Sequence, residues 1–192
     1  KHINRGRLSG ESTDLFQVSR DTNLSGTAES IITPHLDEYA IALDAAMRTR
    51  DAILRGNPKK LFDNILNGNT TQSPEHVEAL VKARINVRDI NDRYIDVISS
   101  SLNLDDGEDF RNRALNRGYP RIYRRTPAQR IIRQAAENEA YEAEIHALIM
   151  QLEFAYLGEL GIINYDLLRL TRSHDPEVQR NRALAGQVRS SG

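Results

Sequence analysis

The feature that most limits the fold of this chain is a set of helix-start signals at its prolines. A capping side chain accepts a hydrogen bond from an unpaired N–H of the first helical turn. Proline fits the next position because it has no N–H to leave unpaired. Five of the six prolines follow a residue of the capping type, and they are Thr33-Pro34, Asn57-Pro58, Ser73-Pro74, Thr126-Pro127 and Asp175-Pro176. These pairs predict five helix starts.

Glycines supply the matching stop signals. Gly56, Gly68, Gly118 and Gly186 each follow a segment with apolar residues every three or four positions, where a glycine C-cap is expected. Starts and stops together predict helices at 34–55, 58–67, 74–103, 107–117, 127–158, 162–173 and 176–185. No stretch alternates with the period of two that is typical of a strand. The expected fold class is therefore all-α.

Three of the expected helices are long, namely 34–55, 74–103 and 127–158, and each carries an apolar stripe with a spacing of three to four residues. This spacing suits helices that pack at shallow angles, so we expect an elongated antiparallel bundle with short connecting helices. The second half of 127–158 carries a second apolar stripe. We therefore expect it to be central in the bundle or buried against another chain. Gly158 and Gly161 are expected to end or bend it.

The domain organisation is expected to follow the change in composition along the chain. Residues 1–30 are rich in Ser, Thr, Gly, Asn and charged residues and have few apolar ones. They predict a flexible N-terminal arm without a core of its own. If the arm orders on the bundle or on a partner, Leu15 and Phe16 are the expected anchor. The bundle domain is expected at 31–186, followed by a C-terminal tail at 187–192.

The composition excludes several classes of protein. The chain has no cysteine, which rules out disulfides, thiol catalysis and thiolate metal sites. Its apolar runs fall far short of the ~20 residues that a membrane-spanning helix needs. Its first residues show no signal-peptide pattern. Because the chain begins at Lys1, we expect a fragment or a processed product, and its compartment stays open.

The chain lacks the common catalytic and metal-binding patterns. None of the five histidines has the spacing of a helical metal site, and Glu142 with His146 does not form the repeated Glu-x-x-His motif of a di-iron bundle. There is no phosphate-binding glycine loop and no Gly-x-Ser-x-Gly motif. The acidic residues at 105–109 lack the spacing of a calcium loop and suit a helix N-terminus. We therefore expect no enzyme activity, no metal and no cofactor.

Charge is strongly segregated along the second half of the chain. Residues 111–133 contain eight arginines and no acidic residue, whereas 134–168 contain seven acidic residues and no lysine or arginine. The centre of the basic block reads RGYPRIYRRTP, at 117–127. The candidate binding residues are Arg117, Tyr119, Arg121, Tyr123, Arg124, Arg125, Arg130 and Arg133.

The basic block has three possible partners. It could meet an acidic surface of another protein or of a second copy. It could instead bind phosphates of nucleic acid or anionic lipid, helped by the N–H groups that begin the helix at 127 and by stacking on the two tyrosines. Finally, its arginines could pair with acidic residues of the same bundle, at 105–109 or 137–144. A separate prediction pairs Arg50, which interrupts an apolar stripe, with Glu142.

We expect a non-catalytic helical interaction or assembly module that forms part of a larger complex. A viral or phage structural protein, or a domain of a secreted effector, would have this kind of composition. The expected partner is another protein or a second copy of the chain. The alternative is a nucleic-acid-binding or packaging protein that uses residues 111–133.

Overall fold

The computed structural model describes residues 8–56 and 73–190, and within these residues it contains helices and no strand. The expected all-α class is thus confirmed. The helix predicted at 58–67 lies outside the described residues. None of the described helices combines the length and the apolar character that a bilayer crossing requires. The elements are α1 (Leu15–Asp21), α2 (Gly26–Arg55), α4 (Pro74–Ser101), α5 (Leu104–Gly118), α6 (Pro120–Tyr123), α7 (Pro127–Ala136) and α8 (Ala143–Ser190).

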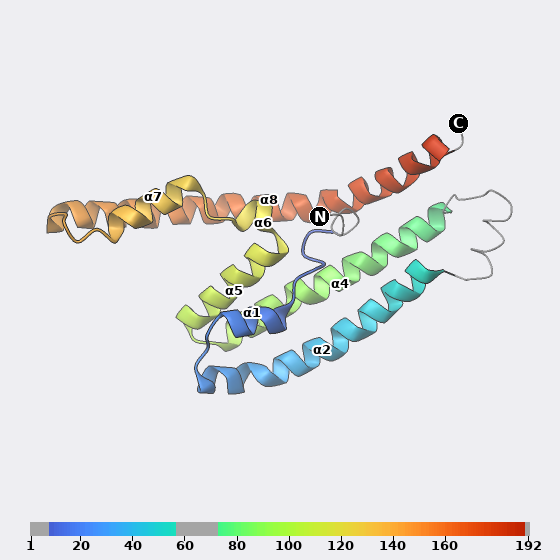
Figure 1. Cartoon of the computed structure of the whole chain (residues 1–192), viewed down its shortest axis with the longest axis horizontal. Helices are drawn as coiled ribbons and strands as arrows, with labels where there is room; N and C mark the ends of the chain where they lie inside the picture. The colour runs from blue at the N-terminus through green and yellow to red at the C-terminus, as the bar shows by residue number, and fades with distance from the viewer. Residues whose placement is uncertain (1–7, 57–72, 191–192) are drawn as a thin grey trace.

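The molecule has a packed body and a projecting pair of helices. Helices α2 and α4 lie antiparallel, and α1 and α5 pack on them (Figure 1). Helix α8 has 48 residues, which makes it about 72 Å long. Its first part packs against α7, and this pair extends beyond the body, while its later part runs over α4 (Figure 1). We call α7 together with residues 143–160 the hairpin, and α1, α2, α4 and α5 the body.

Two of the predicted helix starts are confirmed and one in the body is wrong. Ser73 and Thr126 cap α4 and α7 with their side chains, as the proline pairs predict. In contrast, Pro34 lies inside α2, which begins earlier, after the N-cap Ser25. A proline inside a helix costs about 3 kcal/mol. Burial of the first turns of α2 offsets this cost, because Ile32 is only 1% exposed.

The long helix predicted at 127–158 is wrong, because the chain turns back within it. Helix α7 ends at Ala136, and a turn leads into α8. In this turn the backbone N–H of Ala140 donates to Asn138 Oδ1 at 3.0 Å, and His146 Nε2 lies 2.8 Å from the Ala136 carbonyl oxygen. Local side-chain bonds of this kind compete with helix formation. The turn also lets α7 pack on α8.

The breaks predicted in the last third of the chain are also wrong. Helix α8 continues through Gly158 and Gly161, and Pro176 lies inside it. Asp175, which we expected to cap a new helix, instead accepts the backbone N–H of Ser9 at 3.0 Å. Around Pro176, packing of α8 on α4 holds the helix, since Arg172 and Arg180 bind Asp92 and Glu78 of α4.

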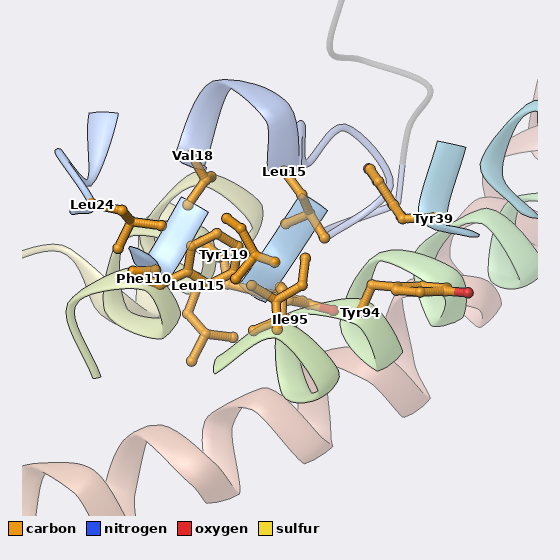
Figure 2. Close-up of a cluster of buried hydrophobic side chains, with 13 residues drawn as sticks. Leu15, Val18, Leu24, Tyr39, Tyr94, Ile95, Phe110, Leu115 and Tyr119 are labelled. Atoms are coloured by element: carbon orange, nitrogen blue, oxygen red, sulfur yellow. The ribbon is translucent and has the colours of Figure 1, made fainter. Parts of the chain in front are cut away.

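The prediction of a flexible N-terminal arm is wrong for the residues from Leu8 onward. The side chains of Leu8, Leu15 and Val18 are at most 2% exposed, and the last two pack among residues of α4 and α5 (Figure 2). The segment has few apolar residues, but nearly all of them face the core. The domain boundary expected at residue 31 falls inside α2. At the other end, α8 includes the first residues of the expected tail, up to Ser190.

A buried asparagine ties the N-terminal segment to the body. Asn91 of α4 is fully buried, and its Nδ2 donates to the carbonyl oxygens of Gly10 at 2.8 Å and Glu11 at 3.2 Å. Its Oδ1 accepts the hydroxyl of Tyr39 at 2.9 Å. Because buried backbone carbonyls are costly when unpaired, these bonds fix the path of the segment.

Arg50 is paired with the same segment, and the predicted Arg50–Glu142 pair is wrong. Arg50 Nη1 lies 3.0 Å from Glu11 Oε1, and its Nη2 lies 2.8 Å from Asp51 Oδ1. Glu142 lies in the turn between α7 and α8. The interrupted stripe of α2 did indicate a half-buried ion pair, but its partner belongs to the segment that we expected to be an arm.

We predict that Leu15→Ala lowers the free energy of unfolding by about 2–5 kcal/mol, because it empties a fully buried site. The matched control is Ile41→Ala on α2, where the side chain is 74% exposed and a change within about 0.5 kcal/mol is expected. Urea unfolding followed by circular dichroism measures both. Equal stability of Leu15→Ala and the wild type would show that the N-terminal segment is not part of the core.

Candidate interaction surface

Four of the eight arginines in the basic block are paired with acidic residues of the same chain. Two of these pairs are Arg113 Nε with Asp109 Oδ2 at 2.8 Å, and Arg133 Nε with Glu137 Oε1 at 2.9 Å. The other two are Arg111 with Asp96 and Arg117 with Asp21. All four pairs are partly exposed, so each contributes little to stability. Half of the block therefore pairs within the chain.

The other four arginines of the block are exposed and available for contact with another molecule. None of them has a carboxylate within 4.0 Å among the described residues. Two come from α6 and the segment after it, and the others lie around the start of α7. These residues are Arg121, Arg124, Arg125 and Arg130. They are the members of the predicted site that stay available for an external contact.

The two tyrosines of the predicted site do not form a stacking surface. Tyr119 is only 2% exposed, and its hydroxyl donates to Asp92 Oδ2 at 2.7 Å. The prediction that Tyr119 stacks on a ligand is therefore wrong, because the ring belongs to the core (Figure 2). Tyr123 is half-buried and packs against the same core, and this burial raises the pKa of its hydroxyl.

The anion site predicted at the start of α7 is also weakened by the structure. Thr126 Oγ1 accepts the backbone N–H of Gln129 at 3.1 Å, and Gln129 Oε1 accepts the N–H of Thr126 at 2.7 Å. Pro127 has no N–H to offer. This capping box satisfies groups that a phosphate would otherwise bind.

Three of the four available arginines line a groove whose opposite wall carries three acidic residues. The groove lies between α5 and the hairpin and has a volume of about 900 Å³. One wall carries Asp105, Glu108 and Asp109 from α5, and the other carries Arg124, Arg125 and Arg130. A phosphate chain in this groove would face carboxylates on one side. The mixed charge suits a protein surface with both signs better than it suits a nucleic acid.

Exposed apolar side chains are concentrated on α7 and α8. Thirteen of the eighteen large apolar residues that are exposed in the described part of the chain lie between 131 and 170. Eight of them lie in the hairpin and its turn, and five lie on the next part of α8, between 162 and 170. We call all thirteen the hairpin surface. They are Ile131, Tyr141, Ile145, Leu148, Met150, Leu152, Phe154, Leu157, Ile162, Ile163, Tyr165, Leu167 and Leu170. Singly exposed apolar residues are normal on a protein surface, whereas a concentration of them on one part of the molecule marks a candidate interaction site.

The sequence predicted part of the hairpin surface. The two apolar stripes of 127–158 indicated a helix that is central or buried against another chain, and the structure leaves Phe154 83% exposed and Leu148 64% exposed. The part after Gly161, such as Tyr165 at 66% exposed, was missed because a new helix was expected there. Continuity of the stripe across the two glycines was the signal that could have revealed it.

The sequence also missed a buried charged cluster where α8 meets the body. Asp92 of α4 accepts hydrogen bonds from Tyr119 and Arg172, and its Oδ1 has no partner among the described residues. Arg88 Nη1 donates to the Arg172 carbonyl oxygen at 3.0 Å. Burial raises the pKa of Asp92, and the hydrogen bond from Tyr119 and the charge of Arg172 oppose this effect. The cluster anchors the later half of α8.

The described residues contain no group of three or more His, Asp or Glu side chains that could hold a metal ion. The features that remain as candidates for function are the hairpin surface and the adjoining groove.

We predict that Tyr119→Phe lowers the free energy of unfolding by about 1.5–3 kcal/mol, because it removes a hydrogen bond to a buried acidic group. Tyr165→Phe is the matched control, since that side chain is 66% exposed and should tolerate the loss of its hydroxyl. Both changes are measured by urea unfolding. If the two variants lose the same small amount, the Tyr119–Asp92 bond does not anchor α8.

Comparisons with known proteins identify no relative of this chain. No family model matches the chain, and neither the curated proteins nor the solved structures yield a match.

Proposed function

We propose that this chain is a non-catalytic interaction module that assembles with other protein through the hairpin surface. The observation that carries the proposal is the concentration of thirteen exposed apolar side chains on α7, α8 and the turn between them. At about 25 cal/mol per Å² of apolar surface removed from water, covering such a surface favours association strongly.

The arrangement of the molecule supports this role. The body has its own buried core, built from α1, α2, α4 and α5 with Tyr119, which requires nothing from the hairpin. The hairpin extends beyond the body, so most of its length is accessible to a partner (Figure 1). A stable body that presents an apolar projection is suited to assembly into a larger complex.

We predict that a photoreactive amino acid at Leu148 or Phe154 cross-links to protein in the cells that naturally make this chain. The same group at Ile41 is the matched control, because that position is 74% exposed but lies on α2. Mass spectrometry identifies the product. The proposal fails if neither hairpin position gives a product, or if Ile41 cross-links as well as they do.

A second candidate function is nucleic-acid binding, and the four exposed and unpaired arginines favour it. The acidic wall of the groove and the capping box of α7 oppose it. We therefore rank it below protein assembly.

We predict no retarded band when the protein is mixed with single- or double-stranded nucleic acid at low ionic strength. Phosphate contacts would be strongest under these conditions, because added salt weakens them steeply. A band that is lost in the variant R121A/R124A/R125A but kept in the control Arg48→Ala would establish the second candidate instead. Arg48 is a suitable control because its side chain is 79% exposed and belongs to α2, outside the basic block.

A further inference from the structure

We propose that a second copy of this chain docks on α8, with the two α8 helices antiparallel about a twofold axis near residues 157 and 158. The inference rests on the proposed function, because it names the partner of one part of the hairpin surface. It starts from six residues on one side of α8, which we call the α8 stripe. They are Ile145, Leu148, Leu152, Ile163, Leu167 and Leu170.

The six side chains of the α8 stripe are exposed, and α7 adjoins their side of the helix at Tyr156. The members of the stripe are between 43% and 64% exposed. They are spaced so that they share one side of the helix. His146, which contacts the end of α7, and Leu168, which packs on the core of the body, lie on a different side. Each of the six side chains of the stripe therefore keeps a large exposed fraction among the described residues.

The spacing of the α8 stripe is the same when it is read from either end. The steps from Ile145 are three residues and then four, and the steps back from Leu170 are also three and then four. In an antiparallel pair with a twofold axis near residues 157 and 158, each residue faces the residue of the second copy that lies equally far on the other side of the axis. The resulting pairs are Ile145 with Leu170, Leu148 with Leu167, and Leu152 with Ile163. Each pair joins two branched aliphatic side chains of equal size, as a self-complementary contact requires.

The polar residues of α8 fit the same arrangement. Between 134 and 168 the chain has acidic residues but no lysine or arginine, and Arg169 is the next basic residue. The antiparallel pairing brings Glu144 of one copy near Arg169 of the other. Both are exposed, and Arg169 has only a loose contact at 3.7 Å with Asp166 in its own chain. The antiparallel arrangement also places the positive end of each helix dipole beside the negative end of the other, which is favourable.

The proposed dimer has one polar pair between its apolar pairs. In this pair, Tyr156 of one copy lies opposite Glu159 of the other, close to the axis. The Tyr156 hydroxyl lies 2.8 Å from Thr126 Oγ1 and so remains tied to α7. Glu159 is exposed and has a long side chain that can reach solvent at the edge of the contact. A partner helix can thus cover the apolar pairs on either side without burying this carboxylate.

The size of the α8 stripe matches a small dimer interface. Six branched side chains that are about half exposed leave on the order of 500 Å² of apolar surface per copy, and two copies therefore bury on the order of 1,000 Å². Specific interfaces begin at about this area. The stripe spans 26 residues, which is about 39 Å of helix, so the contact is long and narrow like that of paired helices in a bundle.

Disulfide cross-linking tests both the partner and the register, since the chain has no cysteine of its own. In the proposed dimer, position 148 lies opposite position 167 of the second copy. The two copies of position 148 lie about 28 Å apart along the helices, whereas a disulfide needs Cα atoms within about 7 Å. An oxidised mixture of Leu148→Cys and Leu167→Cys should link about half of the chains, because random pairing makes half of the dimers mixed. Neither variant alone should link.

Ile41→Cys provides the control for random collisions, because it is 74% exposed and lies off the stripe. Its mixture with Leu148→Cys should give no product. Circular dichroism checks that each variant keeps its helices. A disulfide from Leu148→Cys alone would overturn the antiparallel register, and equal linking of the Ile41→Cys mixture would overturn the specific contact.

Two further outcomes separate this inference from the proposed function. A wild-type protein that stays monomeric by light scattering at high concentration, with photo-cross-links at Leu148 to a different protein, overturns the second copy but leaves the interaction module standing. Absence of any photo-cross-link at the hairpin, with no disulfide in the mixed sample, overturns both. A dimer by light scattering together with the mixed disulfide supports the inference.

Discussion

The fold depends on the place where the N-terminal segment crosses the end of α5. The backbone N–H of Gly10 donates to the carbonyl oxygen of Gly118 at 2.8 Å, and Gly10 adopts a left-handed φ of 82°. A Cβ on Gly10 would lie 2.4 Å from the Tyr119 hydroxyl, and a Cβ on Gly118 would lie 2.6 Å from Thr13 Oγ1. A larger residue at Gly10 or Gly118 would force the Tyr119 or Thr13 side chain to shift, and at Gly10 it would also strain the left-handed backbone. Through the Gly10–Gly118 contact the first described residues close the core over α4 and α5, and Asn91 fixes their path.

Helix content could be predicted from the sequence, but the limits of several helices could not. A Xaa-Pro pair does not start a helix where buried residues before it hold the chain helical. Ser73 and Thr126 cap α4 and α7, whereas Ile32 packs in the core and carries α2 back beyond Pro34. The N-terminal segment shows the same limitation. Its low apolar content predicted disorder, yet composition does not reveal that nearly every apolar side chain faces inward.

The charge pattern of the sequence predicted where the candidate site lies, and the structure shows which of its residues are available to a partner. The sequence shows that eight arginines are clustered, and it left open their pairing with acidic residues at 105–109 or 137–144. Asp109 and Glu137 do pair in this way, whereas the partners Asp96 of α4 and Asp21 of α1 were not expected. The sequence also cannot show that Tyr119 points inward, since the loop-like sequence around it gave no periodic pattern. Apolar periodicity was the more informative signal. It pointed to a surface on the long helix, and the structure extends that surface past the two glycines where the sequence suggested an end.

The unbroken course of α8 has a mechanical consequence. Its later half is fixed to the body by Arg172, which binds Asp92, and by Asp175, which binds the N–H of Ser9. Its first half lies in the projecting pair of helices (Figure 1). Because one continuous helix joins the two halves, a partner on the projecting half would be linked to these two anchors without an intervening loop. Ser9 is next to Gly10, where the N-terminal segment meets the end of α5. The same helix thus connects the projecting end of the molecule to the segment that closes its core.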